Sequence, residues 1–162
     1  MYLTGLNHYS HKKLTMEQEN KVVVSRSKIG GELPIVVSEI IDGCLYSGFF
    51  GTLDSARMKF VTDKILAYND SMDINTIIID LGNVEIIDSA VAVHLVNVAD
   101  SLRLVGTDVT FCGMKPIIAQ SITKMGINIS GASFSKNLKT ALKDILAKKG
   151  LRITAAPTAA AL

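Results

Sequence analysis

A run of β-branched residues in the middle of the chain constrains the fold most. Residues 76–81 (Thr-Ile-Ile-Ile-Asp-Leu) are nearly all apolar or β-branched, which is typical of a central strand covered on both faces of its sheet. Soon after this run, Val91, Leu95 and Val98 follow a helical spacing that continues to a stop signal at Gly106. A buried strand followed by such a helix predicts an α/β fold whose strands are joined by right-handed crossovers.

The segment at residues 35–49 is predicted to be a β-hairpin. Two apolar runs, 35–41 and 44–49, are separated by Asp42-Gly43. This dipeptide is preferred in type I′ turns, because both central residues of such a turn need a positive φ. The sheet is therefore expected to begin with an antiparallel pair.

Three further helices and two further strands are predicted from spacing and turn signals. Thr52 is expected to cap a helix that ends near Ser71, and Gly82-Asn83 is expected to form the turn after the central strand. The fold class is thus α/β, with a mixed sheet, an antiparallel N-terminal hairpin, parallel strands after it, and about four helices. The remaining elements are, in order, a strand around Val109 and Phe111, a helix from Pro116 to Gly126, a short strand at 132–134 and a helix ending at Gly150.

The length of 162 residues suits one domain. Gly30-Gly31 before Pro34 is typical of a short linker. We therefore expect residues 1–33 to form a partly flexible N-terminal arm, residues 34–150 to form the domain, and residues 151–162 to be a disordered tail.

Charge and motif content exclude several classes of function. Residues 34–128 carry six Lys or Arg against eleven Asp or Glu, whereas residues 129–162 carry six against one. The positive residues are mostly lysines on one helix face, so no nucleic-acid partner is predicted. The sequence has no P-loop, no G-x-G-x-x-G, no C-x-x-C pair and no apolar run of about 18 residues. We therefore expect a cytoplasmic protein without a cofactor or a membrane partner.

Neither the cysteines nor the N-terminal histidines predict a metal site. Cys44 and Cys112 each lie in an apolar, β-rich segment and are expected to be buried thiols. His8 and His11 have the spacing that could place them on one helix face, but no Cys or carboxylate cluster surrounds them. We expect no metal ligand among these residues.

Three groups of polar residues fall where ligands of open α/β sheets bind, outside the carboxyl ends of the strands. They are Asp80, Asp88-Ser89 and Lys115-Pro116. If Ser89 opens a helix, its hydroxyl lies near unpaired N–H groups and the positive end of the helix dipole, where a phosphate is tolerated. Phosphorylation would add about −1.5 to −2 charge beside Asp88, and would act at a binding surface rather than by unfolding the helix. The alternative is that Ser89 only caps the helix.

Two other readings of these residues are weaker. A nucleophilic serine needs a base in reach and usually a G-x-S-x-G elbow, whereas His94 lies more than a helical turn from Ser89. A response-regulator receiver with Asp80 as phospho-acceptor and Lys115 as its lysine would need an acid pair at the end of its first strand, and Asp42 instead belongs to the hairpin turn. We therefore predict no catalytic residue and no enzymatic activity, and keep the receiver as the less favoured alternative.

Several segments resemble the STAS domain of the anti-sigma factor antagonist family. They are residues 77–81, residues 84–89 (Val-Glu-Ile-Ile-Asp-Ser) and residues 113–120 (Gly-Met-Lys-Pro-Ile-Ile-Ala-Gln), followed by Met-Gly-Ile at 125–127. The second and third segments together are similar to the stressosome branch, the RsbR and RsbS proteins. The resemblance spans residues 34–148.

The resemblance implies a regulatory scaffold. Within the family, the residue matching Ser89 is phosphorylated by a GHKL-type serine kinase of the RsbT kind, which the unphosphorylated surface sequesters and the phosphorylated surface releases. A serine phosphatase of the RsbX kind resets the switch, and other STAS proteins join a large co-assembly. Ser121 matches a weaker, secondary phosphorylation site. The partner-binding surface is expected to contain Asp80, Asp88, Ser89, Met114 and Lys115.

The place of the chain within this branch stays open at the level of sequence. Ser rather than Thr after Asp88, and an N-terminal arm too short for a sensory domain, favour an RsbS-like role, whereas residues 90–94 are nearer to RsbR. A different kind of protein is also possible. In that alternative, the domain is an unphosphorylated STAS interaction module that binds a small ligand or a transporter subunit.

Overall fold

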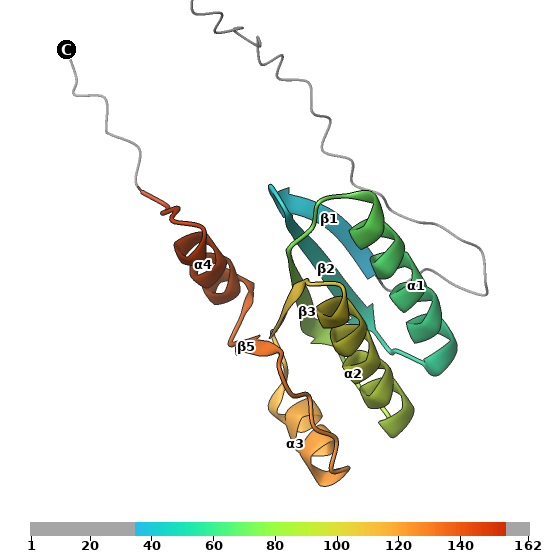
Figure 1. Cartoon of the computed structure of the whole chain (residues 1–162). Coiled ribbons are helices and arrows are strands. Elements are labelled where there is room, and N and C mark those ends of the chain that lie inside the picture. Colours follow the sequence, from blue (N-terminus) through green and yellow to red (C-terminus); the bar gives the residue numbers. More distant parts are fainter. Residues whose placement is uncertain (1–34, 155–162) are drawn as a thin grey trace, which may run out of the picture.

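The structure is a computed structural model that describes residues 35–154 (Figure 1). The five strands and four helices of this part alternate after an initial hairpin. The strands are β1 (Ile35–Ile41), β2 (Cys44–Gly51), β3 (Thr76–Val84), β4 (Asp108–Cys112) and β5 (Ser133–Ser135). The helices are α1 (Ser55–Ser71), α2 (Ser89–Leu104), α3 (Pro116–Lys124) and α4 (Leu138–Lys148).

The strands form one mixed sheet in the order β1-β2-β3-β4-β5. β1 pairs with β2 in antiparallel fashion, and every later pair is parallel. The predicted fold class, with its antiparallel opening and its parallel continuation, is confirmed.

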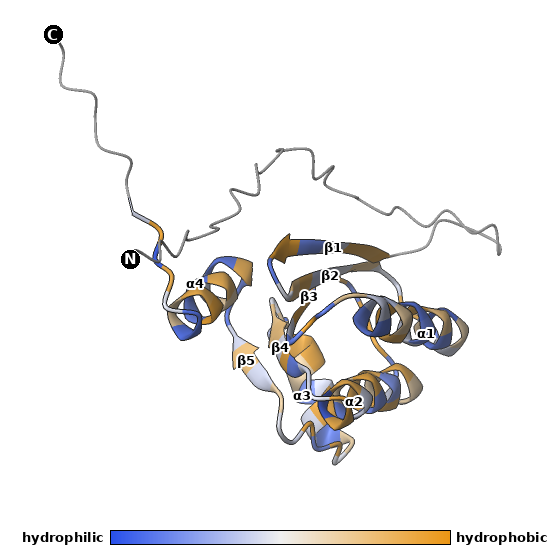
Figure 2. Ribbon diagram, turned by 45° about the horizontal axis from the view of Figure 1, so that its top comes forward, coloured by the Kyte–Doolittle hydropathy of each residue, from blue (hydrophilic) through white to orange (hydrophobic). Residues whose placement is uncertain are grey.

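The central strand β3 is covered on both faces. Ile77 and Ile79 belong to the larger core cluster, which also takes buried residues from α1, α2 and α3. Ile78, between them, faces the smaller cluster beneath Ala141 and Ile145 of α4. Figure 2 shows α1 and α2 together on one side of the sheet and α4 on the other. This two-sided burial explains the nearly continuous apolar run of the strand.

The hairpin and the central strand differ in detail from the sequence prediction. Gly43 has a φ of +72°, but no residue other than glycine has a positive φ in residues 35–154, so Asp42 does not and the expected type I′ turn is wrong. The register instead shifts between Glu39 and Ile41. The predicted turn at Gly82-Asn83 is also wrong, because β2 pairs with β3 as far as Val84 and thereby extends the strand.

The helix boundaries follow local capping signals. Asp54, and not Thr52 as predicted, is the N-cap of α1, and its Oδ1 accepts a hydrogen bond of 2.9 Å from the Arg57 amide. A carboxylate two residues nearer the helix reaches an amide that would otherwise be unpaired. The predicted start of α3 at Pro116 and the stop of α2 before Gly106, whose φ is +88°, are confirmed.

The two cysteines are buried, as predicted. Burial raises the pKa of both thiols, to about 12 at Cys112, where the neighbouring Asp80 carboxylate adds to the shift. Residues 151–154 have no regular secondary structure. The predicted arm, most of the predicted tail, and His8 and His11 lie outside the described residues. None of the helices in residues 35–154 is long and apolar enough to cross a membrane.

Candidate functional site

The candidate residues follow three neighbouring parallel strands. Because β2, β3 and β4 run in the same direction, the connections to α1, α2 and α3 lie at one edge of the sheet (Figure 1). This edge is where ligands and partners of α/β sheets commonly bind. The topology therefore brings the Asp88-Ser89 and Met114-Lys115 segments to the same edge.

Ser89 is the first residue of α2 and is exposed. Asp88, directly before it, is the N-cap, and its Oδ1 accepts a hydrogen bond of 2.8 Å from the amide of Val91. The Ser89 hydroxyl makes no hydrogen bond to any other described residue, whereas Ile87 and Val91 on either side are buried. A phosphate on this hydroxyl would meet the first amides of the helix and the positive end of its dipole.

Asp80 is an internal residue of β3, not the end of the strand as predicted. Its Oδ1 accepts a hydrogen bond of 2.8 Å from the amide of Gly82, and its Oδ2 accepts one of 3.2 Å from the hydroxyl of Tyr46. Burial and the Asp80 carboxylate raise the pKa of Tyr46 to about 12. Both Asp80 oxygens are thus engaged within the protein.

Met114 and Lys115 form the connection between β4 and α3. Both are half-buried, and Lys115 occupies the N-cap position of α3 without a side-chain capping bond. Two large apolar side chains that the sequence analysis missed flank the candidate residues. Ile86, before Asp88, is 68% exposed and Ile117, after Pro116, is 63% exposed. These two side chains offer apolar area beside the polar candidate residues, as a protein-binding surface requires.

Ser121 lies in a different environment. It is in the interior of α3, and its hydroxyl donates a hydrogen bond of 2.8 Å to the carbonyl of Ile117. An amide in the interior of a helix is already paired with a carbonyl one turn earlier, so a phosphate there would find no unpaired amide. Ser121 remains a predicted secondary site with less structural support than Ser89.

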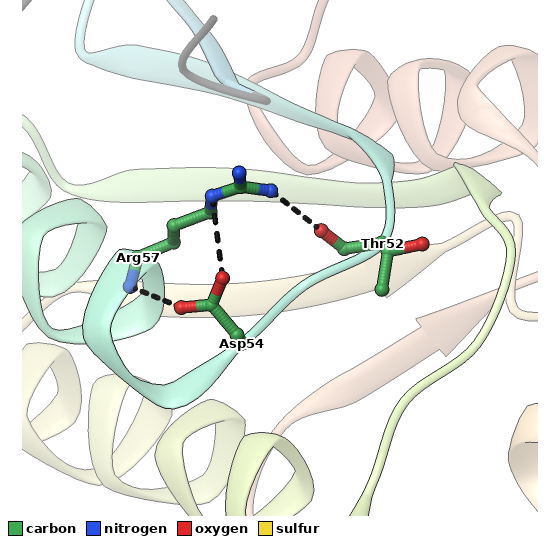
Figure 3. A network of polar contacts seen from close by, with 3 residues as sticks. All are labelled: Thr52, Asp54 and Arg57. Carbon is green, nitrogen blue, oxygen red and sulfur yellow. Dashed lines mark hydrogen bonds and ion pairs between the residues drawn. The ribbon is translucent and has the colours of Figure 1, made fainter. Parts of the chain in front are cut away.

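The sequence analysis also missed a repeated tripeptide. Asp-Ser-Ala stands at residues 54–56 at the start of α1 and again at residues 88–90 at the start of α2. Figure 3 shows Asp54 of the first copy with Thr52 and Arg57. The guanidinium of Arg57 contacts Asp54 at 3.2 Å and donates to the carbonyl of Thr52 at 3.3 Å. The repeat in the sequence was the signal that could have identified Asp54 as a cap.

Comparison with known proteins identifies relatives of this chain. The family model of the STAS domain matches residues 36–143. The RsbT co-antagonist protein RsbRD of Bacillus subtilis is 27% identical over 143 residues, which cover 88% of this chain and 49% of the relative. RsbRA of the same organism is 29% identical over 125 residues, with coverages of 74% and 46%. The chain thus spans about half the length of these curated relatives.

Solved structures show the same fold. A serine-to-glutamate variant of Moorella thermoacetica RsbS aligns with a TM-score of 0.61 and 23% identity, over 74% of this chain and 98% of the other. The anti-sigma factor antagonist SpoIIAA in its unphosphorylated form aligns with a TM-score of 0.56 and 14% identity, over 70% and 97% of the two chains. The chain belongs to the STAS-domain family, and the resemblance to the RsbR proteins of the stressosome branch is confirmed.

Proposed function

We propose that this chain is a phosphorylation-switched regulatory scaffold of the stressosome type. In its unphosphorylated form it would sequester a GHKL-type serine kinase of the RsbT kind, and phosphorylation of Ser89 would release that kinase. The observation that carries the proposal is the position of Ser89, which is exposed at the start of α2 with its hydroxyl unpaired among the described residues. The RsbT co-antagonists among the relatives support the choice of partner.

The switch would act through charge at the surface. The Asp88 carboxylate caps α2 by accepting the Val91 amide. Phosphorylation of Ser89 would leave this cap in place. The helix would therefore stay folded while its start gains about −1.5 to −2 charge beside the exposed Glu85 and Asp88. A partner seated on Ile86 and Ile117 would then face a hydrated dianion at the edge of its apolar contact, which disfavours the complex.

The remaining parts of the proposal concern the partners. The protein would serve as substrate and scaffold and would not catalyse a reaction. An RsbX-like serine phosphatase would reset Ser89, and other STAS proteins would join the chain in a large cytoplasmic co-assembly. Relatives named as RsbT co-antagonists and a fold neighbour from a stressosome structure support the co-assembly part of the proposal.

The test is phosphorylation by a cognate serine kinase with ATP, followed by mapping of acid-stable phosphate by mass spectrometry. We expect phosphate on Ser89, and we expect Ser89→Ala to abolish it. Ser55→Ala is the matched control, since Ser55 also follows an aspartate N-cap at a helix start, and it should be phosphorylated like the wild type.

Two outcomes would contradict the proposal. An acid-labile phosphate adduct on Asp80 would instead favour the hypothesis of a response-regulator receiver. An unmodified protein, with a kinase that phosphorylates another STAS substrate in the same assay, would favour the interaction module that binds a ligand or transporter subunit without phosphorylation.

A further inference from the structure

Two glycines bring the end of β3 against the start of the connection after β4. Gly82 lies near the end of β3, and Gly113 follows the last residue of β4. A Cβ atom on Gly113 would lie only 2.7 Å from the Gly82 nitrogen and 2.8 Å from the Gly82 Cα. Gly113 also has a φ of +69°, which side chains disfavour. The close approach of the two backbones therefore requires glycine at position 113.

The carboxylate of Asp80 completes this contact. Its Oδ1 holds the Gly82 amide at 2.8 Å, and the same oxygen would lie 2.7 Å from a Cβ on Gly113. Its Oδ2 accepts the bond from Tyr46 of β2. Asp80 thus bonds to Gly82, occupies space that a side chain at position 113 would need, and is itself held from the neighbouring strand.

The segments that follow these two glycines carry the two halves of the expected partner surface. Residues 83–88 lead from Gly82 to Ser89, and Met114-Lys115 lead from Gly113 into α3. Each helix has its own buried anchor, Val91 in α2 and Ile118 in α3. Both anchors lie in the larger core cluster, which holds each helix in place, and the glycine contact adds a second link between the two helix starts.

We propose that Asp80, Gly82 and Gly113 form a clasp that sets the spacing between the Ser89 segment and the Met114-Lys115 segment. Asp80 is then a positioning residue that acts from beneath the surface and does not touch the partner. This inference rests on the proposed function, because the spacing matters only if one kinase contacts both segments.

The chain offers matched variants for testing the clasp. Gly113→Ala adds a Cβ that collides with Gly82 and Asp80, whereas Gly126→Ala, at a φ of +67°, meets nothing within 4 Å. The pair therefore shares the backbone strain and differs in the collision. Asp80→Ala removes the bond to Gly82, and Tyr46→Phe removes only the other bond of that carboxylate.

The first measurement is the set of amide chemical shifts of the free protein. Gly113→Ala and Asp80→Ala should shift amides in both segments, 83–89 and 114–118. Gly126→Ala should shift amides only near the end of α3, and Tyr46→Phe should leave residues 114–118 unchanged. If Gly113→Ala does not fold, Gly82→Ala serves instead, because its Cβ would lie at a milder 3.1 Å from Asp80 Oδ1 and should give the same pattern with smaller shifts.

The second measurement is the kinetics of Ser89 phosphorylation. Gly113→Ala should raise KM about tenfold with kcat unchanged, because the surface is misplaced while the hydroxyl is intact. The KM of Gly126→Ala should stay within about twofold of the wild type.

Amide shifts confined to one segment in Gly113→Ala, or equal KM values for the two glycine variants, would overturn the clasp. If the wild-type chain is not a kinase substrate, the proposed function fails. In that case, coupled shifts in both segments would still support the clasp, and their absence would overturn it.

Discussion

The units β2–α1 and β3–α2 lie side by side and enter their helices with the same three residues. Asp54 and Asp88 both accept the amide of the residue three positions later, at 2.9 and 2.8 Å. The residue before each cap, Leu53 or Ile87, is buried in the same core cluster. The two starts thus share backbone, cap and anchor. A sequence of Asp-Ser in this fold therefore specifies the start of a helix, and does not by itself specify a regulatory site.

What separates the two starts is the fourth residue and the surface around it. In α1 this residue is Arg57, which folds back onto Asp54 and the carbonyl of Thr52 (Figure 3). In α2 it is Val91, which is fully buried, and Asp88 forms no ion pair within residues 35–154. Ser55 is half-buried, whereas Ser89 is exposed. The surroundings, rather than the tripeptide, make Ser89 the better candidate for phosphorylation.

The largest expected difference between the two starts is in kinase affinity. Ser89→Asp should weaken binding of the cognate kinase about 100-fold, close to 3 kcal/mol, because it places a charge where the partner docks. Ser55→Asp should change the affinity by less than about threefold, since its charge is added beside Arg57. Calorimetric titration of both variants with the kinase measures the contrast. Equal losses of kinase affinity in the two variants would show that the partner responds to charge anywhere along this edge and does not bind specifically at the start of α2.

The next difference is one of stability and should be small. Asp54→Ala and Asp88→Ala should each lower the free energy of unfolding by about 1 kcal/mol, because each leaves a helix amide without its acceptor. Arg57→Leu should cost less than about 0.5 kcal/mol, since the ion pair of Arg57 with Asp54 is exposed. Urea titration followed by circular dichroism provides these values. A much larger loss for Asp88→Ala would indicate that the start of α2 depends on its cap more than the start of α1 does.

The sequence predicted the architecture well because periodicity reports burial. Ile78 and its neighbours in β3 are buried on both faces, as the apolar run indicated. Errors fell where tertiary pairing or a nearby alternative decided the outcome. Gly82-Asn83 is a turn-forming pair, yet pairing with β2 keeps it in a strand, and Thr52 is a suitable cap, yet Asp54 lies closer to the helix.

The candidate site could be predicted in part. The capping pattern placed Ser89 at a helix start, because that pattern is local in the sequence. The exposure of Ile86 and Ile117 could not be predicted, since each lies in an apolar segment that could equally have been buried. The contact between Gly82 and Gly113 joins residues from two strands, and nothing in either local sequence indicates it.

A last small effect concerns β2, the strand that leads to α1. Ser47 of β2 pairs with Ile79 of β3, and both are fully buried, but the Ser47 hydroxyl has no hydrogen-bond partner among the described residues. An unpaired buried hydroxyl is destabilising, so Ser47→Ala should raise the free energy of unfolding by about 0.5–1 kcal/mol.

Thr107→Val is the control, because the hydroxyl of Thr107 is buried and donates to Asn69 at 2.8 Å. Its removal should lower the free energy of unfolding by about 1 kcal/mol. Urea unfolding curves measure both changes in the free energy of unfolding, provided that the variants share one m value. A loss of stability in Ser47→Ala would mean that the hydroxyl is paired in the folded protein.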